Sequence, residues 1–74
     1  MILNPRTIGD RVRKLRKAEN KSQEMLAEMA DTSTRTICNI ETGMVLPSLQ
    51  TLTNIADSLE CSLDDLIGRE HQET

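Results

Sequence analysis

Four side chains that could form specific polar contacts with a large ligand lie close together in the middle of the chain. Their spacing puts them on one face of a helix; they are Thr34, Arg35, Cys38 and Asn39. An arginine can donate two parallel hydrogen bonds to guanine, and an asparagine can pair with adenine in a similar bidentate way. This set therefore favours hydrogen bonding to base edges over a chemical reaction, although a surface Arg35 paired with a nearby acid is the simpler alternative.

The chain offers little to any other kind of site. Its one histidine, His71, lies in the polar C-terminal stretch, and no acid, base and nucleophile converge as in a catalytic set. Cys38 and Cys61 stand far apart, and neither belongs to a CxxC pair. This pattern argues against a zinc site and against a disulfide framework. We therefore expect free thiols, no metal, no cofactor and no enzymatic activity.

Helices must position these residues, because no stretch alternates apolar and polar residues as a strand does. Thr7 and Asp10 have nearly the spacing of a capping box and predict that the first helix starts at Thr7. Ile8, Val12 and Leu15 then form one apolar stripe. The pattern predicts an all-α fold with an N-terminal arm over residues 1–6, a domain over residues 7–67 and a polar tail over residues 68–74.

Two short helices joined by a tight turn are predicted between residues 22 and 41. Ser22 and Ser33 can cap the two helices, and Asp31 breaks the pattern between them. The inner positions of both helices share one small core, which makes them cross at a steep angle. These inner positions are Leu26, Ala27, Ala30, Ile37 and Ile40. The polar outer face of the second helix then protrudes in a form suited to the major groove of DNA.

Two further helices follow in the C-terminal half. Gly43 ends the third helix at a position that requires a left-handed backbone. Pro47 and Ser48 start the fourth, whose predicted inner face holds Leu49, Leu52, Ile55, Ala56 and Leu59. Ser62 and Asp65 form a capping box for a short fifth helix that ends at Gly68.

The net charge of −3 conceals an uneven distribution of charged residues. Residues 1–21 carry seven basic and two acidic side chains, a net charge of +5, whereas residues 22–74 carry two basic and ten acidic ones, a net charge of −8. Only the basic part can approach phosphate. Arg13, Lys14 and Lys17 are the candidate phosphate contacts, and an ordinary solvated helix is the alternative interpretation.

No apolar run approaches the ~18 residues that a membrane span needs. The first five residues lack the basic and long apolar regions of a signal peptide. We therefore expect a cytoplasmic protein that does not interact with a membrane.

Several linked motifs in this chain resemble the Cro/C1-type (Xre-family) helix-turn-helix domain, the group of phage repressors and restriction-modification controller proteins. They are Ser22-Gln23-Glu24-x-Leu26-Ala27, Ser33-x-x-Thr36-Ile37-x-x-Ile40-Glu41-x-Gly43, Pro47-Ser48-Leu49-x-Thr51-Leu52-x-x-Ile55-Ala56 and Ser62-Leu63-Asp64-Asp65-Leu66. The resemblance covers roughly residues 6–67. It implies a compact five-helix, lambda-repressor-like DNA-binding domain.

The resemblance also implies roles for individual residues. Gln23 matches a glutamine that contacts phosphate, and the helix starts at Ser22 and Ser33 suit phosphate as well. Arg16 and Glu41 match a pair that forms a structural salt bridge, so we do not expect Arg16 to contact DNA. The positions that face base edges in the family are occupied here by Thr34, Arg35, Cys38 and Asn39.

The sequence departs from the family at several positions. Lys21 replaces an apolar residue and offers a further phosphate contact, while Asp31 stands where the turn usually has glycine. The loop of residues 44–46 is apolar where the family often has polar or basic residues. Met25 and Met29 occupy positions that are usually polar, where they either fill gaps at the margin of the core or form a partner surface.

These observations predict a homodimeric transcriptional regulator, most simply a repressor, that binds double-stranded DNA at an inverted-repeat operator. We expect the dimer surface to involve the fifth helix and an apolar loop, through Leu63, Leu66, Ile67, Met44 and Leu46. The three residues of the fifth helix also help to close the core, and the sequence leaves open how they divide between core and interface. The acidic composition and the exposed methionines favour a different hypothesis. In that hypothesis the same fold is a protein-interaction module, such as an antitoxin-like partner.

Overall fold

The starts of the first four helices depend on one recurring hydrogen bond. The computed structural model describes residues 3–67, and within that range it contains α1 (Pro5–Ala18), α2 (Gln23–Met29), α3 (Thr34–Glu41), α4 (Leu49–Ser58) and α5 (Leu63–Ile67). The side chain before each of α1 to α4 accepts a hydrogen bond from a backbone N–H of the first turn; these residues are Asn4, Ser22, Ser33 and Ser48. Such caps pair N–H groups that have no partner within the helix.

The same four helices share one kind of ending. In each, the residue after the C-cap has a left-handed backbone; these residues are Asn20, Asp31, Gly43 and Glu60, with φ values of 57°, 59°, 78° and 55°. Two backbone hydrogen bonds then close each helix in the Schellman arrangement, as in the bonds from Asp31 N to Glu28 O and from Thr32 N to Ala27 O. The chain therefore reverses sharply at each join while two backbone hydrogen bonds close the helix end.

The fifth helix begins with a reciprocal capping box, as the sequence predicts. Ser62 N donates to Asp65 Oδ2, and Asp65 N donates to Ser62 Oγ, both at 3.1 Å. The predicted end of this helix at Gly68 and the polar tail of residues 68–74 lie outside the described residues.

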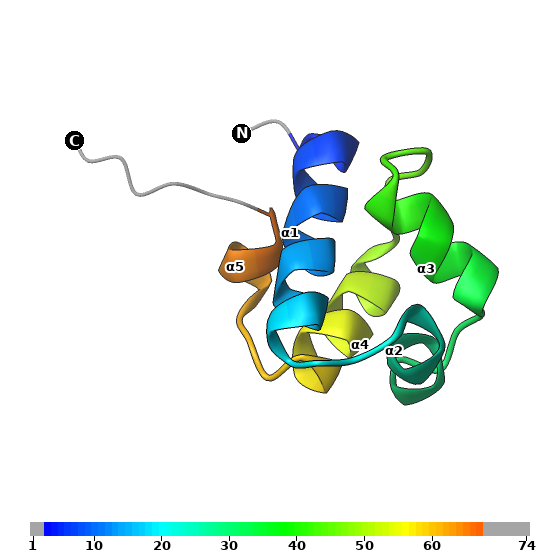
Figure 1. The fold of residues 1–74 in the computed structure, drawn as a ribbon. Helices are drawn as coiled ribbons and strands as arrows, with labels where there is room; N and C mark the ends of the chain where they lie inside the picture. The colour runs from blue at the N-terminus through cyan, green and yellow to red at the C-terminus, as the bar shows by residue number, and fades with distance from the viewer. Residues whose placement is uncertain (1–2, 68–74) are drawn as a thin grey trace.

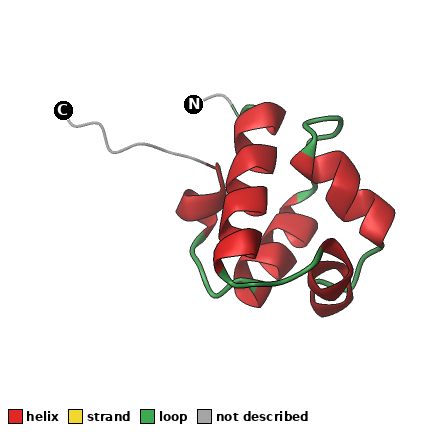
Figure 2. Ribbon diagram, in the orientation of Figure 1, coloured by secondary structure: helices red, strands yellow, loops and turns green. Residues whose placement is uncertain are grey.

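Figures 1 and 2 show the helices around one core, with α1 between α3 on one side and α5 on the other. The α2 helix packs against α3 and α4, and α4 also packs against α5. All five inner positions predicted for the two central helices are buried, as are Ile8, Val12, Leu52, Ile55, Ala56, Leu59 and Leu66. The all-α prediction is therefore confirmed.

Two details of the sequence prediction are wrong. The α1 helix starts at Pro5 rather than Thr7, because Asn4 caps it and proline suits the first helical position. Pro5 and Arg6 thus belong to the helix and not to an arm. Leu49 is 70% exposed, because it is the first residue of α4 and projects away from the core, unlike Leu52 one turn later.

A glycine permits the close approach of α1 to the end of α3. A Cβ atom on Gly9 would lie 2.2 Å from the carbonyl oxygen of Ile40 and 2.8 Å from that of Glu41. These are backbone atoms, so they cannot move aside as the end of a flexible side chain could. Gly9 therefore fixes how closely α1 can support the last turn of α3.

The left-handed turn at Glu60 predicts an unusual response to glycine. A left-handed backbone costs an ordinary residue about 1–2 kcal/mol, and Glu60 has no short polar side chain to relieve it. We expect Glu60→Gly to raise the free energy of unfolding by about 1 kcal/mol, measured by urea denaturation. The matched control is Glu28→Gly in the exposed face of α2, which should lower it by about 0.5 kcal/mol. Equal losses for both variants would contradict the assigned turn.

Candidate nucleic-acid interface

The outer face of α3 carries the four residues that the sequence singles out. Thr34, Arg35 and Cys38 are exposed and Asn39 is half-buried, whereas Ile37 and Ile40 on the opposite face are fully buried. Ser33 orders the start of this helix, because its hydroxyl accepts from Thr36 N at 3.0 Å and pairs with Thr36 Oγ1 at 2.9 Å. The four side chains thus share a short, polar and accessible surface on a helix that is held from behind.

A buried ion pair holds the other end of α3 against α1. Arg16 donates from Nε to Glu41 Oε2 at 2.6 Å and from a second guanidinium nitrogen to Glu41 Oε1 at 3.1 Å. Its third hydrogen bond, 2.8 Å long, reaches the carbonyl oxygen of Lys21 in the loop between α1 and α2. The two side chains are only 10% and 3% exposed. The structure therefore pairs Arg16 with Glu41 as the family resemblance implies, and the pair lies largely covered at the base of a surface hollow.

The charge on Arg16 is stabilised by this contact. The hydrogen bond from Arg16 to Glu41 raises the pKa of Arg16 above its ordinary value, against the opposing effect of burial. A raised pKa in the folded state means that this contribution to stability is complete below the unfolded pKa and disappears only as pH rises through the folded one. Arginine is charged at every pH at which proteins normally operate, so the guanidinium remains charged throughout that range.

Glu41 connects the ion pair to the first residue of α2. Gln23 Nε2 donates to Glu41 Oε1 at 3.1 Å, and the Gln23 side chain is half-buried. An amide nitrogen has two N–H groups, so this bond leaves Gln23 a second donor. The ion pair therefore orients the glutamine that the sequence assigns to phosphate, at the start of α2 and beside the end of α3.

The basic side chains of α1 divide between two sides of the molecule. Arg13 and Lys17 are exposed and line a hollow together with Gln23 and Thr42, next to the end of α3. Arg6 lines a neighbouring hollow with Glu41 and Thr42. The sequence does not single out Arg6 as a phosphate contact. The Asn-Pro pair before it could have placed it in the first turn of α1, because this pair is a known signal for a helix start.

Other predicted phosphate contacts are not brought to this surface. Lys14 lines a hollow on the α5 side of α1, and its ammonium nitrogen lies 3.5 Å from Asp10 Oδ2. Lys21 has a side chain that is 19% exposed, with its ammonium nitrogen 3.9 Å from Glu19 Oε1. Lys14 therefore faces away from α3, and Lys21 is largely covered.

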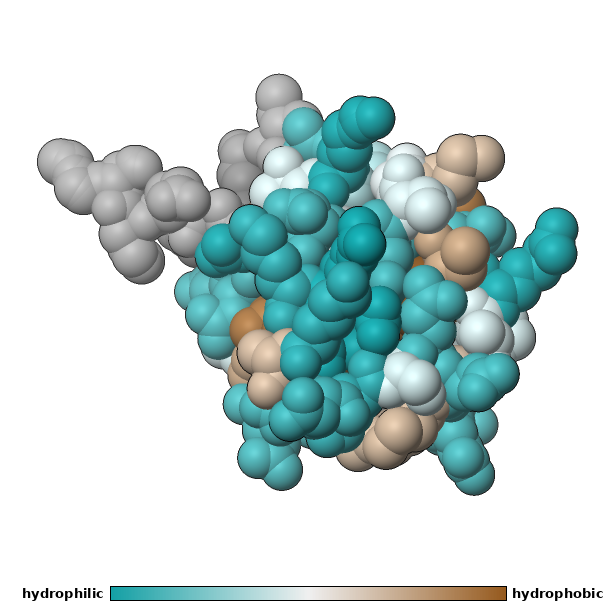
Figure 3. All heavy atoms as spheres, viewed as in Figure 1, coloured by the Kyte–Doolittle hydropathy of each residue, from teal (hydrophilic) through white to brown (hydrophobic). Residues whose placement is uncertain are grey.

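The residues predicted for a dimer surface do not form one surface. Leu66 is 0% exposed, so its assignment to the interface is wrong; Leu63 and Ile67 are half-buried against the core. Met44 and Leu46 are 75% and 50% exposed, and their loop lies beyond α3, on the side of α1 opposite to α5 (Figure 1). Figure 3 shows hydrophobic atoms in that region and a mainly hydrophilic surface along α1.

The cysteines and methionines lie at different depths. Both cysteines are free; Cys38 is exposed and Cys61 is half-buried. Burial, with Asp65 and Glu19 nearby, raises the pKa of the Cys61 thiol, which makes it less reactive. Met25 and Met29 are each about half exposed on α2, more than side chains that fill gaps in a core.

Residues 3–67 offer neither a metal site nor a membrane span. In that part of the chain, no three His, Cys, Asp or Glu residues are grouped so that they could hold a metal ion. None of its helices is long and apolar enough to cross a membrane.

Comparison with known proteins identifies the class to which this fold and surface belong. A family model described as Helix-turn-helix (HTH_3) matches residues 12–66. The chain belongs to this helix-turn-helix family, which confirms the resemblance stated for the sequence and the lambda-repressor-like fold.

Individual relatives are phage and bacterial regulators. The cryptic phage CTXphi transcriptional repressor RstR of Vibrio cholerae is 40% identical over 62 residues, which are 84% of this chain and 55% of that protein. The HTH-type transcriptional regulator AnsR of Bacillus subtilis is 36% identical over 63 residues, which are 85% of this chain and 54% of that protein. The chain thus spans about half the length of the curated relatives that it matches.

Solved structures agree with this assignment. The restriction-modification controller protein C.AhdI of Aeromonas hydrophila has a TM-score of 0.82 at 28% identity, covering 88% of this chain and 98% of that one. The P22 c2 repressor, solved in complex with a synthetic operator, has a TM-score of 0.76 at 30% identity, covering 80% of this chain and 89% of that one.

The buried ion pair predicts a large difference between two glutamate substitutions. We expect Glu41→Gln to lower the free energy of unfolding by about 3 kcal/mol, because it leaves the buried Arg16 charge without a counter-charge. Glu19→Gln removes the exposed partner of Lys21 and should cost under about 0.5 kcal/mol. Urea denaturation of both variants measures the difference, and similar small decreases would show that Arg16 is not held mainly by Glu41.

Proposed function

We propose that this chain binds double-stranded DNA sequence-specifically, as a homodimeric transcriptional repressor at an inverted-repeat operator. The observation that carries this proposal is the exposed polar face of α3, held against α1 and α2 by the Arg16–Glu41–Gln23 network. A helix of this length and shape fits the major groove, where each base pair presents a distinct pattern of donors and acceptors. The repressor relatives support the regulatory role.

In this proposal, one group of residues contacts the bases and another contacts the phosphates. Arg35 reads guanine, Asn39 pairs with adenine, and Thr34 and Cys38 contact neighbouring bases or methyl groups. Arg6, Arg13, Lys17 and Gln23 contact phosphates on the flank of the recognition helix, with help from the helix starts at Ser22 and Ser33.

The exposed apolar loop after α3 supports a symmetric dimer. Met44 and Leu46 are exposed in the loop between α3 and α4, and the exposed Leu49 begins α4. If this loop meets its symmetry mate, the two copies of α3 lie on either side of the twofold axis with their first turns pointing outward. Half-sites in such complexes are separated by about one helical turn, roughly 34 Å.

Selection of binding sites from random duplex DNA tests the proposal. We expect an enriched inverted repeat, and a binding constant that falls steeply with salt concentration because bound phosphates release counterions. An enriched single half-site would contradict the homodimer. No enrichment, together with weak binding that is insensitive to salt, would contradict DNA recognition altogether.

A second candidate function has one specific observation in its favour. Met25 and Met29 each expose about half of their surface on α2. Flexible methionines are typical of surfaces that bind other proteins. Absence of DNA enrichment in the selection would favour this protein-interaction role.

Two arginine substitutions separate base reading from phosphate binding on the selected site. We expect Arg35→Ala to relax the preference at one position in each half-site and to reduce discrimination by about 1–3 kcal/mol. We expect Arg13→Ala to weaken binding to all sequences alike and to reduce the salt slope by about one unit for each phosphate that the variant no longer neutralises. Unchanged preference in Arg35→Ala, measured by fluorescence anisotropy with mismatched duplexes, would remove Arg35 from the reading face.

A further inference from the structure

The turn between α2 and α3 depends on a single peptide plane. The two hydrogen bonds that close α2 are accepted by the carbonyl oxygens of Ala27 and Glu28. The carbonyl of Ala30, the C-cap residue, must therefore find its partner outside the helix. This carbonyl belongs to the same peptide as the N–H of Asp31, which donates to Glu28 O at 3.2 Å and precedes the left-handed backbone of Asp31.

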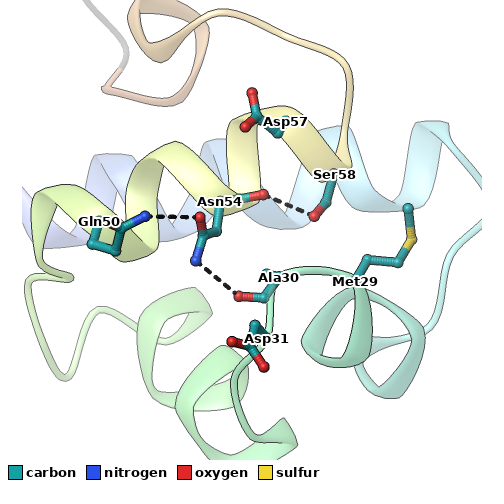
Figure 4. A pocket seen from close by; sticks show the side chains of 7 residues that line it. All are labelled: Met29, Ala30, Asp31, Gln50, Asn54, Asp57 and Ser58. Atoms are coloured by element: carbon teal, nitrogen blue, oxygen red, sulfur yellow. Dashed lines mark hydrogen bonds between the residues drawn. The ribbon is translucent and has the colours of Figure 1, made fainter.

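The partner comes from α4. Asn54 Nδ2 donates to Ala30 O at 3.2 Å, and this contact is partly buried (Figure 4). Gln50, one turn earlier on α4, donates to Asn54 Oδ1 at 3.0 Å and so fixes which end of the amide faces the turn. Ala30, Gln50 and Asn54 line a hollow between α2 and α4, together with Met29, Asp31, Asp57 and Ser58.

The Ala30–Asp31 peptide is thus held from both ends. Its N–H is bonded within α2, and its C=O is bonded to α4. Rotation of this peptide would change ψ of Ala30 and φ of Asp31, the two angles that set the direction in which the chain leaves α2. The α3 helix starts only three residues after Asp31. A small rotation here would therefore displace Thr34 and Arg35, which are the first residues of that helix.

We propose that Asn54 is a positioning residue for DNA recognition, although it does not face DNA itself. It holds the helix-turn-helix angle from α4 at the first turn of α3, while the Arg16–Glu41 pair holds the last turn from α1. This inference rests on the proposed function, because it assigns Asn54 to the geometry of the same base-reading surface.

A matched pair of variants separates positioning from simple stability. Asn54→Leu keeps the branched shape and the number of side-chain heavy atoms, and removes both amide hydrogen bonds. Ser58→Ala, the control, removes a 2.8 Å hydrogen bond to the backbone carbonyl of Asn54 on the same helix and in the same hollow, without touching the turn. At a temperature where both variants are fully folded, a decrease in stability alone does not change DNA affinity.

The measurement is the ratio of affinity for the selected operator to affinity for an unrelated duplex, at one salt concentration. We expect Asn54→Leu to lower this ratio between about twofold and thirtyfold, while Ser58→Ala leaves it unchanged. In the free protein, the carbonyl ¹³C resonance of Ala30 should shift in Asn54→Leu and stay in place in Ser58→Ala. Gln50→Ala, which keeps Asn54 but removes its orienting donor, should show a smaller decrease in the same ratio and serves if Asn54→Leu does not fold.

The outcomes distinguish this inference from the proposed function. A parent chain that prefers an operator, with the same preference in Asn54→Leu despite a shifted Ala30 resonance, would overturn the role of Asn54 alone. A parent chain without any preferred sequence would overturn the proposed function and this inference with it.

Discussion

The ion pair between Arg16 and Glu41 is the interaction on which the recognition surface depends. It connects the last turn of α1, the loop before α2 and the last residue of α3, and through Gln23 it reaches the first residue of α2. A buried charge pair is costly to desolvate, and an apolar replacement is often as stable. The pair matters here for geometry, because the two parallel hydrogen bonds between a guanidinium and a carboxylate fix the relative placement of the helices that carry them.

Hydrogen bonds at the ends of the first four helices stabilise the fold alongside the apolar core. A chain without aromatic residues has only aliphatic side chains and methionines for its interior, and a domain of this size has little core to spare. Each of the first four helices therefore has a capped start and a left-handed Schellman ending. These local devices define where each helix stops, and so the direction in which the next one leaves.

Local signals make most of the fold predictable from sequence. The caps at Ser22 and Ser33, the break at Asp31, the capping box at Ser62 and the inner positions of α2 and α3 depend on neighbours a few residues away, and the structure confirms them. Apart from the start of α1, which the local cap at Asn4 sets, the predictions that fail depend on tertiary placement. The two sides of α1 cannot be distinguished before α3 and α5 are positioned, so the sequence alone groups Lys14 with Arg13. Likewise, the sequence alone cannot divide Leu63, Leu66 and Ile67 between core and interface, and Asn54 gives no signal at all until α4 lies beside the turn.

The central claim is that the Arg16–Glu41 pair positions the reading surface rather than merely stabilising the fold. The double variant Arg16→Met with Glu41→Leu tests it, because an apolar pair can fill the site while Gln23 loses its partner. The account predicts a free energy of unfolding within about 2 kcal/mol of the parent, together with operator affinity about tenfold lower, or about 1.4 kcal/mol, and little change in affinity for unrelated DNA. Operator affinity equal to that of the parent, in a variant of equal stability, would contradict it.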